Sequence, residues 1–379
     1  MGKKLRACVL ALTAALLLCG CGGLYDKEYV SVSEYEPAAQ QGIGSGDKIT
    51  VKTFAALKQA LLRCAYAGQT EGAIVFDQAY EGDTTEDMAS ACWQVRTQDA
   101  LCAYCVENIA YELNKIVTIN EASVYISYSQ YAMSPEEILH MTYSSGVADE
   151  LKTAMESRKN DLVLLISRSG YDAEEMEKAV QEVYRENPAI VPREPTANVN
   201  MFSGTGTQRL YEISINYGMN EEELQQRTAQ LQALNAFTEE QRRSMSDGEK
   251  VIAACQYLMT HCAVTDTATE NTAYSALING AANSEGLAFA YVELCDQLGL
   301  DCRIVYGQYL WADHCWNIVR VDGNFYHVDV SAAIQRGIET GVLFSDERFW
   351  GDYRWDVASY PKCVGELKYE DMVLEPQSA

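Results

Sequence analysis

The chain has few basic residues, prolines and histidines for its length. Its 379 residues include 29 Lys and Arg against 54 Asp and Glu, which gives a formal net charge of −25. Because a surface this acidic repels phosphate backbones, nucleic acid is excluded as a general partner. Only 7 prolines occur, which excludes a collagen-like or proline-rich chain. The 4 histidines, with a single close cysteine pair, argue against a structural zinc site, and no metal or other cofactor is expected.

The chain also lacks an apolar run of the roughly 20 residues that a membrane span requires. Residues 7–18 come nearest, and they follow a basic start that contains Lys3, Lys4 and Arg6. This order is typical of an export signal. The run ends in Leu18-Cys19-Gly20-Cys21, which resembles a bacterial lipobox. The resemblance implies a lipoprotein signal peptide over residues 1–20 and a lipid on Cys21, with an ordinary secretory signal as the alternative.

A lipid on Cys21 would hold the mature protein at the extracellular face of the cell membrane. Residues 21–49 are rich in Gly, Ser, Glu and Gln, which predicts a flexible linker to the folded body. Outside the cell, disulfides are permitted but not required. The close pair, Cys102 and Cys105, lies in an apolar helical stretch and not at the strand-to-helix turn of a thioredoxin-like site. Buried free thiols are therefore expected, and the pairing of the ten cysteines of the body stays open.

Two segments in the middle of the chain are similar to each other. Residues 125–138 align without gaps on residues 211–224, and shorter matches precede each of them. Each copy reads as helix, strand, helix and strand. The pattern predicts two tandem small α/β units, residues 50–146 and 147–237, followed by a domain over residues 238–379. The units contain no cluster of catalytic residue types, so their expected role is spacing or partner binding.

A candidate nucleophile lies at the start of a buried helix. The stretch Gly280-Ala-Ala-Asn-Ser284-Glu-Gly286 precedes an apolar periodic pattern that stops at Gly299. Ser284 then falls in the first turn, where free backbone N–H groups and the helix dipole stabilise negative charge. The alternative is that Asn-Ser simply caps the helix, which is the more common role of such a pair.

A candidate base and its carboxylate lie on a predicted hairpin. Asp322-Gly323 predicts a two-residue turn, in which Val321 faces Asn324. Counting back, Trp316 lies opposite Asp329 and His314 opposite Ser331. His314 and Asp329 are then diagonal neighbours on one face, within reach of a hydrogen bond. His314 is thus a candidate base oriented by a carboxylate.

The neighbouring residues are weaker candidates. Because side chains alternate along a strand, Cys315 points to the face opposite His314 and is not expected to replace the nucleophile. His327 shares the face of His314, and we interpret it as a flank of the site.

Three motifs together resemble the transglutaminase-like superfamily, whose fold is that of the papain-type cysteine proteases. The family pattern G-x-x-x-C-x-G, H-x-W-N and H-V-D-V corresponds to Gly280 to Gly286, His314-Cys-Trp-Asn317 and His327-Val-Asp329-Val330. The resemblance implies an α+β fold with a transglutaminase-like (papain-like) domain behind the two α/β units. It also implies a triad at 284, 314 and 329, and a substrate cleft flanked by Tyr274 and Trp316.

The sequence departs from the family at the centre of this triad, because Ser284 stands where the family has cysteine. A thiol in such a site can ionise below neutral pH, whereas a hydroxyl must lose its proton during attack. Leu287 replaces the family's aromatic residue, and Ser331-Ala332-Ala333 replaces Thr-Trp-Asp. Three departures in one place predict impaired catalysis.

Three functions remain open at this point. The first is a catalytically impaired module that binds a peptide or a peptidoglycan-linked substrate. The second is an active acyl transferase or peptide hydrolase that uses Ser284, His314 and Asp329. The third is a scaffold that acts through the tandem α/β units. A monomer is expected, and calcium is not implied because no dense loop of Asp and Asn ligands occurs.

Overall fold

The computed structural model describes residues 48–116 and 119–374. The signal peptide, nearly all of the linker and Cys21 lie outside these described residues, so the lipid anchor and the extracellular location stay predictions. Within the described ranges, the helices are too short or too polar for any of them to span a bilayer.

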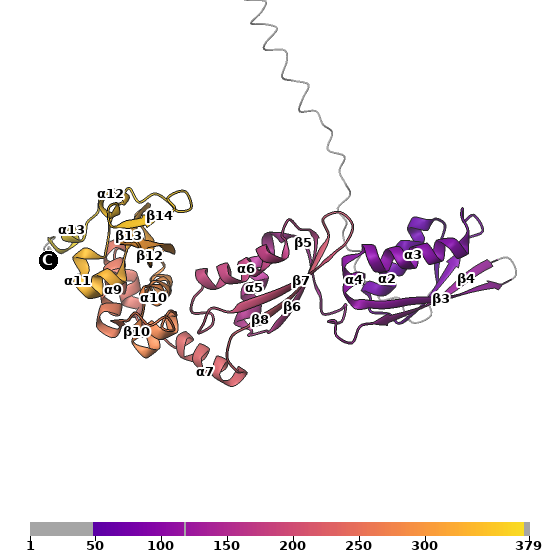
Figure 1. Cartoon of the computed structure of the whole chain (residues 1–379), viewed down its shortest axis with the longest axis horizontal. Helices are drawn as coiled ribbons and strands as arrows, with labels where there is room; N and C mark the ends of the chain where they lie inside the picture. Colours follow the sequence, from indigo (N-terminus) through magenta and orange to yellow (C-terminus); the bar gives the residue numbers. More distant parts are fainter. Residues whose placement is uncertain (1–47, 117–118, 375–379) are drawn as a thin grey trace, which may run out of the picture. The chain divides into compact units, whose positions relative to one another are not determined.

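The first α/β unit is a four-stranded sheet whose helices cover one face (Figure 1). The strand order is β1-β2-β4-β3, with β1 and β2 parallel and the other pairs antiparallel. The elements are β1 (Lys48–Val51), α2 (Phe54–Tyr66), β2 (Glu71–Phe76), α3 (Thr84–Gln98), α4 (Ala100–Cys105), β3 (Val106–Ile116) and β4 (Ile119–Tyr128).

The second α/β unit has the same strand order, β5-β6-β8-β7. Val163, Leu165 and Leu210 of this sheet pack into the core of the first unit, which explains the unbroken apolar run in β6. That the two units derive from one repeated sequence stays a prediction. The elements are β5 (Leu139–Tyr143), η1 (Ser144–Gly146), α5 (Val147–Glu156), β6 (Asp161–Arg168), α6 (Ala173–Glu186), β7 (Thr196–Ser203) and β8 (Arg209–Asn216).

The structure corrects three details of the sequence analysis. Each unit has four strands where the pattern indicated two, because a leading strand and one strand of a hairpin were missed. The first strand, β1, begins at Lys48, inside the predicted linker. Strand β5 belongs to the second sheet, although residues 139–143 were assigned to the first unit. It pairs in parallel with β6 and α5 makes the crossover, so the unit must begin before residue 147.

The C-terminal domain packs helices against a sheet of order β13-β12-β11-β14. Its helices begin with α7 (Glu221–Gln232), α8 (Glu239–Ser244), α9 (Asp247–His261) and α10 (Ser284–Leu298). The sheet strands are β11 (Cys302–Tyr309), β12 (Ala312–Val321), β13 (Asn324–Val328) and β14 (Tyr353–Trp355). The remaining elements are β9 (Ala263–Val264), η2 (Ser275–Asn279), β10 (Ala281–Ala282), α11 (Val330–Arg336), η3 (Ile338–Thr340), α12 (Asp346–Phe349) and α13 (Tyr369–Leu374).

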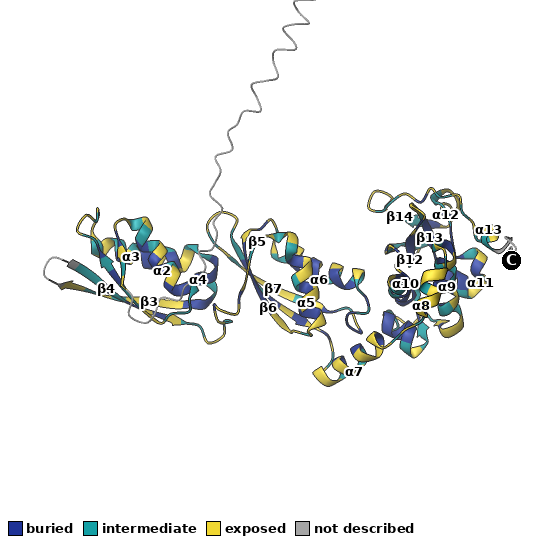
Figure 2. Ribbon diagram, turned by 180° about the vertical axis from the view of Figure 1, so that it is seen from behind, coloured by how far each residue is buried: buried dark blue, intermediate teal, exposed yellow. Residues whose placement is uncertain are grey.

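Helix α10 is the centre of this domain. Ten of its residues are buried, the class that Figure 2 draws in dark blue. Its apolar character therefore extends around most of the helix. It ends at Gly299 with φ +73°, a left-handed conformation that favours glycine. Helix α9 begins with the predicted capping box of Ser246 and Glu249. Because α10 is buried along most of its length, Ser284 at its start has a fixed position.

Candidate active site

Ser284 is the first residue of α10 and is half-buried. The cap is Asn283, whose side-chain oxygen accepts a hydrogen bond from the N–H of Gly286 at 3.1 Å. Ser284 itself is therefore not the cap, and its hydroxyl is left for another contact. That contact is the backbone N–H of Cys315, which lies 3.4 Å from Ser284 Oγ.

Gly286 allows the chain to approach the first turn of α10 closely. A Cβ at this position would lie 2.9 Å from the carbonyl oxygen of Glu270 and from the amide nitrogen of Thr272. Any larger residue would push this backbone away from the start of the helix. The second glycine of the motif thus has a steric role next to Ser284.

His314 and Asp329 meet as the hairpin register predicts. The pairs Val321–Asn324 and Asn317–Val328 follow that register, and His314 Nε2 lies 2.8 Å from Asp329 Oδ2. The register ends there, since Asp329 leaves the strand and caps α11. The expected pairing of His314 with Ser331 is therefore wrong, because Ser331 is already helical.

Asp329 is 1% exposed and accepts three hydrogen bonds. Oδ2 accepts from His314 and from the Tyr353 hydroxyl at 2.7 Å, and Oδ1 accepts from the N–H of Ala332 at 3.0 Å. Burial raises the pKa of this carboxyl, but the hydrogen bonds outweigh burial and hold its pKa below the usual value. Asp329 is therefore ionised at neutral pH and fixes the orientation of the His314 ring.

The structure brings the three residues together, but the hydrogen bonds that join Asp329 to His314 do not continue to Ser284. With Asp329 accepting at Nε2, that nitrogen of His314 carries the proton and Nδ1 has the lone pair. Among the described residues, Ser284 and His314 share no hydrogen bond, and Ser284 Oγ instead accepts from the Cys315 N–H. An N–H donor at this position stabilises an anion, as an oxyanion or thiolate site requires. It does not remove the proton of a hydroxyl.

The two residues expected to flank a cleft are buried. Trp316 is 1% exposed and packs against Phe349, Tyr353 and Trp355. Tyr274 is 9% exposed, its hydroxyl donates to Gln230, and the Arg227 guanidinium covers its ring. The predicted cleft role is therefore wrong for both. The apolar faces of these residues are used in packing, which the motif alone does not reveal.

A chain of hydrogen bonds links Trp316, His327 and Asp346. The Nε1–H of Trp316 donates to His327 Nδ1 at 3.0 Å, and His327 Nε2 lies 2.9 Å from Asp346 Oδ1. Since an indole N–H can only donate, Nδ1 must accept, and the proton of the neutral ring lies on Nε2. His327 thus fixes the orientation of the Trp316 ring, which agrees with the interpretation of His327 as a residue that flanks the site.

The same histidine belongs to the described group of side chains best placed to hold a metal ion. The ligand atoms of His327, Asp346 and Cys363 lie within 4.8 Å of one another. Both ring nitrogens of His327 are occupied, however, one by the Trp316 N–H and one by the hydrogen bond to Asp346. Metal binding requires a free imidazole lone pair, so this arrangement fits a hydrogen-bond chain better than a metal centre.

We expect His327 to make the stability of the domain depend on pH. Burial lowers the pKa of His327 below its unfolded value of about 6.5. The unfolded chain therefore binds a proton more readily, and stability falls as the pH drops below about 6.5, by up to about 1.4 kcal/mol per pH unit. A His327→Gln variant should lose this part of the slope in urea titrations followed by tryptophan fluorescence.

The matched control is His261→Gln, because His261 is exposed at the end of α9. Burial also lowers the pKa of His140, but that contribution is the same in both variants. Equal slopes for His327→Gln and the wild type would contradict the buried, neutral assignment of His327.

Cys315 is half-buried beside Ser284, and burial raises the pKa of its thiol to about 12. At neutral pH it is therefore a thiol and not a nucleophilic thiolate. Its contribution to the site is its backbone N–H. Cys102 and Cys105, the close pair of the first unit, are buried and unpaired at the short helix α4.

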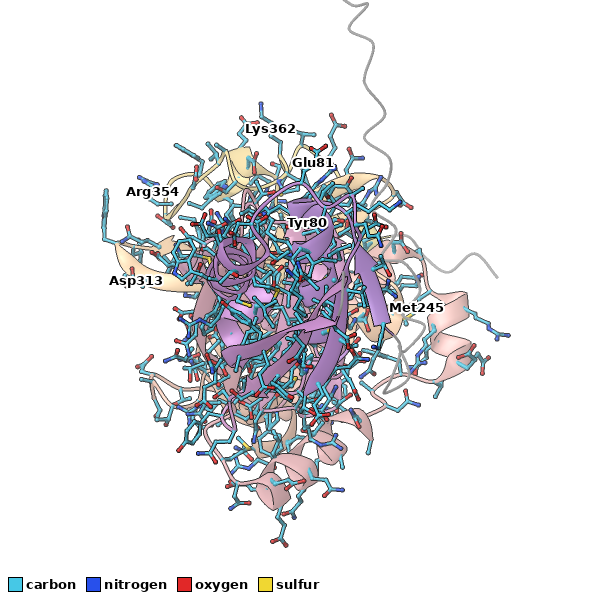
Figure 3. The ribbon with its side chains drawn as sticks, turned by 90° about the vertical axis from the view of Figure 1, so that its right-hand side faces the viewer. Tyr80, Glu81, Met245, Asp313, Arg354 and Lys362 are labelled. Carbon is cyan, nitrogen blue, oxygen red and sulfur yellow. The ribbon has the colours of Figure 1, made fainter. Side chains whose placement is uncertain are left out.

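An exposed aromatic surface at the turn between β11 and β12 gave no signal in the sequence motifs. Leu310 and Trp311 form the turn between β11 and β12, and both have positive φ, 49° and 72°. Such turns favour Asn-Gly, so two bulky apolar residues are strained there. The Arg354 guanidinium lies 5.3 Å from the Trp311 ring and 5.8 Å from that of Trp350. Figure 3 labels Arg354 and Asp313, which lie on strands that flank β11.

Comparison with known sequences gives a family match for the segment that contains these residues. Residues 235–330 match the Transglutaminase-like superfamily, and this segment contains Ser284, His314 and Asp329. The chain therefore carries a transglutaminase-like domain, as the motifs predicted. No curated protein sequence matches the chain.

Solved structures give only weak likenesses. A structure described as a TGase is 11% identical, with a TM-score of 0.23, over 55% of this chain and 61% of its own. A candidate cysteine protease from Cytophaga hutchinsonii is 12% identical, with a TM-score of 0.24, over 45% of this chain and 73% of its own. Menin is 21% identical, with a TM-score of 0.21, over 30% of this chain and 26% of its own. The chain thus spans 61% of the TGase chain, and the assignment of the domain rests on the sequence match and not on these structures.

Proposed function

We propose that the protein is a cell-surface lipoprotein whose transglutaminase-like domain binds peptide, including peptide linked to peptidoglycan, with catalysis impaired at Ser284. The location rests on the residues that precede Leu24, above all on the lipobox-like sequence at Cys21. The peptide class rests on the family of the domain.

One observation supports the proposal that catalysis is impaired. Ser284 Oγ accepts a hydrogen bond from the Cys315 N–H, and among the described residues no hydrogen bond joins it to His314, whose Nε2 is bonded to Asp329. A serine nucleophile needs a base that takes its proton during attack. A cysteine at the same position would need only stabilisation of its thiolate, which the N–H, the helix start and an imidazolium supply.

The intact His314–Asp329 pair favours a second candidate. Asp329 is held by three donors, so the ring of His314 stays oriented for proton transfer. A slow acyl transferase or peptide hydrolase that uses Ser284 would employ the same three residues. A scaffold that acts through the α/β units remains the third candidate.

The test is a calorimetric titration of the wild-type protein with peptides that contain glutamine or lysine, followed by mass spectrometry of the peptides. We expect binding without conversion. Cross-linked, deamidated or shortened peptide would contradict impaired catalysis and favour the enzyme. Absence of binding to every peptide would contradict the proposed peptide site.

A further inference from the structure

Two exposed tryptophans of the C-terminal domain lie against one arginine. Trp311 and Trp350 are 77% and 59% exposed, although tryptophan is a mostly buried residue type. The Arg354 guanidinium lies 5.3 Å from the centroid of the Trp311 ring and 5.8 Å from that of Trp350, so it restricts both rings. Neither tryptophan belongs to the hydrophobic clusters of the domain. Core packing therefore does not account for the two indoles.

The turn that presents Trp311 is held in a strained conformation. Leu310 and Trp311 both have positive φ, which bulky residues rarely adopt. The N–H of Leu310 donates to the carbonyl oxygen of Asp352 at 2.9 Å, which ties this turn to the loop that follows Trp350. Such strain persists only where the surrounding structure enforces it, and it is concentrated at ligand-binding and active sites. The conformation of this turn thus favours a binding role for the exposed ring.

A row of polar side chains accompanies the indoles. Gln308 pairs with Asp313 of β12 and with Arg354 of β14, and directly paired residues of a sheet share a face. Gln308 Nε2 donates to Asp313 Oδ1 at 3.5 Å. Arg354 Nη1 donates to the carbonyl oxygens of Gly351 and Tyr353, and no described residue accepts from its Nε or Nη2. Figure 3 shows Arg354 and Asp313 on the same side of the molecule. The row therefore offers both donors and acceptors.

We call five of these side chains the indole–guanidinium surface: Gln308, Trp311, Asp313, Trp350 and Arg354. Its charges favour a neutral partner. Arg354 is offset by Asp313 and by the exposed Asp352, so no excess of positive charge is present for an anionic polymer or for the phosphates of a lipid surface. A second copy of the chain is disfavoured as well, because each copy has a net charge of −25.

We infer that the indole–guanidinium surface binds a neutral glycan, with a pyranose ring stacked on Trp311. A pyranose with equatorial hydroxyls exposes C–H groups on its faces, and their partial positive charge suits the negative face of an indole. The hydroxyls at its rim both donate and accept, which matches Asp313, Gln308 and the free N–H groups of Arg354. The inference goes beyond the proposed function, because it assigns a second class of ligand to a separate surface.

This surface and helix α10 share one face of the sheet. Asp313, Cys315 and Asn317 alternate along β12, so their side chains point to the same face. Asn317 Nδ2 donates to the carbonyl oxygen of Ala288 in α10, and the Cys315 N–H donates to Ser284 Oγ. Asp313 is two residues from Cys315, which is about 7 Å along a strand. A sugar that carries a peptide can therefore place that peptide near Ser284.

Saturation-transfer NMR of the whole protein with chitotetraose and cellotetraose, two neutral β-1,4-linked glycans, tests the inference. We expect saturation to be stronger for the ring protons on one face of a sugar than for those on the other, as stacking requires. Trp311→Ala should weaken binding about tenfold or more, as truncation of an aromatic anchor does. The matched control is Trp93→Ala, which removes a 56% exposed indole from α3 and should leave binding unchanged.

A second variant, Arg354→Gln, keeps both indoles and removes the guanidinium, and it should also weaken binding. Equal binding by the wild type and Trp311→Ala would overturn the inference, as would failure of the wild type to bind either glycan. Saturation of millimolar dihexanoyl phosphatidylcholine in place of the glycans, lost in Trp311→Ala, would overturn it in favour of a lipid surface. Because no peptide is present, none of these results decides whether the domain binds peptide.

Discussion

A Ser284→Cys variant is expected to react with iodoacetamide at position 284 on the order of 10³ times faster than at Cys315. The helix start, the Cys315 N–H and His314 all favour a thiolate at 284. Burial, by contrast, raises the pKa of Cys315 to about 12, against about 8.5 for an unperturbed thiol. Since each pKa unit changes the thiolate fraction tenfold, a gap of three units or more gives this ratio. Peptide mapping by mass spectrometry over a time course measures both rates.

The other cysteines give little background in this experiment. Burial raises the pKa of Cys92 and Cys262 to about 11 and that of Cys105 to about 12. Adding His314→Ala to Ser284→Cys should slow labelling at 284 by an order of magnitude or more, because the imidazolium partner is lost. Labelling of 284 no faster than that of Cys64 or Cys363 would show that the start of α10 is not a nucleophile site.

Replacement of Asp329 by alanine is expected to cost about 3–5 kcal/mol of the free energy of unfolding, because buried partners are left uncompensated. The carboxylate caps α11 through the Ala332 N–H and accepts from both His314 and Tyr353. Asp329→Asn keeps the cap and the volume, so its cost should be smaller, about 1–2 kcal/mol. Urea titrations followed by tryptophan fluorescence measure both, since four of the five tryptophans lie between residues 311 and 355.

The sign of the pH dependence provides a further check on Asp329. Its pKa in the folded protein is below the unfolded value, so its contribution is present above about pH 4 and is lost as the pH falls through the folded pKa. The difference in stability between the wild type and Asp329→Asn should therefore shrink in acid. A matched surface variant, Asp313→Asn, should change stability by less than about 0.5 kcal/mol at all pH values. Equal costs for Asp329→Asn and Asp313→Asn at neutral pH would contradict the assigned role of Asp329.

Local rules were enough to predict the meeting of His314 and Asp329. The Asp322-Gly323 turn fixes the register of β12 and β13, and the register determines which side chains share a face. The start and end of α10 followed from its apolar period and from Gly299. These features depend on residues close in the chain, which is why the sequence alone could indicate them.

The burial of the two residues expected to flank a cleft could not be predicted in the same way. Trp316 and Tyr274 occupy motif positions, but their surroundings come from α12, β14 and α7, whose packing no local pattern reveals. The strand β5 was placed in the wrong unit because its partner, β6, lies beyond a helix. In both cases a contact between distant segments decided the outcome.

The contact of the second α/β unit with α10 was missed for the same reason. Tyr184 precedes the transglutaminase-like segment by some 50 residues and does not lie in a motif. In the structure, one hydrophobic core joins the second α/β unit to α10, and Tyr184 packs against Phe289 of that helix. The α/β unit thus packs against α10, as the contact of Tyr184 with Phe289 shows, which a role as a simple spacer would not require.

Turnover by three forms of the protein tests the central claim, that an otherwise intact site is impaired by Ser284. The wild type, Ser284→Cys, and Ser284→Cys with His314→Ala are assayed for amine incorporation into a glutamine peptide and for peptide hydrolysis. We expect activity in Ser284→Cys alone, at least about 10²-fold above the wild type, since a base-assisted thiolate replaces an unactivated hydroxyl. Turnover by the wild type that a His314→Ala variant abolishes would contradict the account and identify a working serine enzyme.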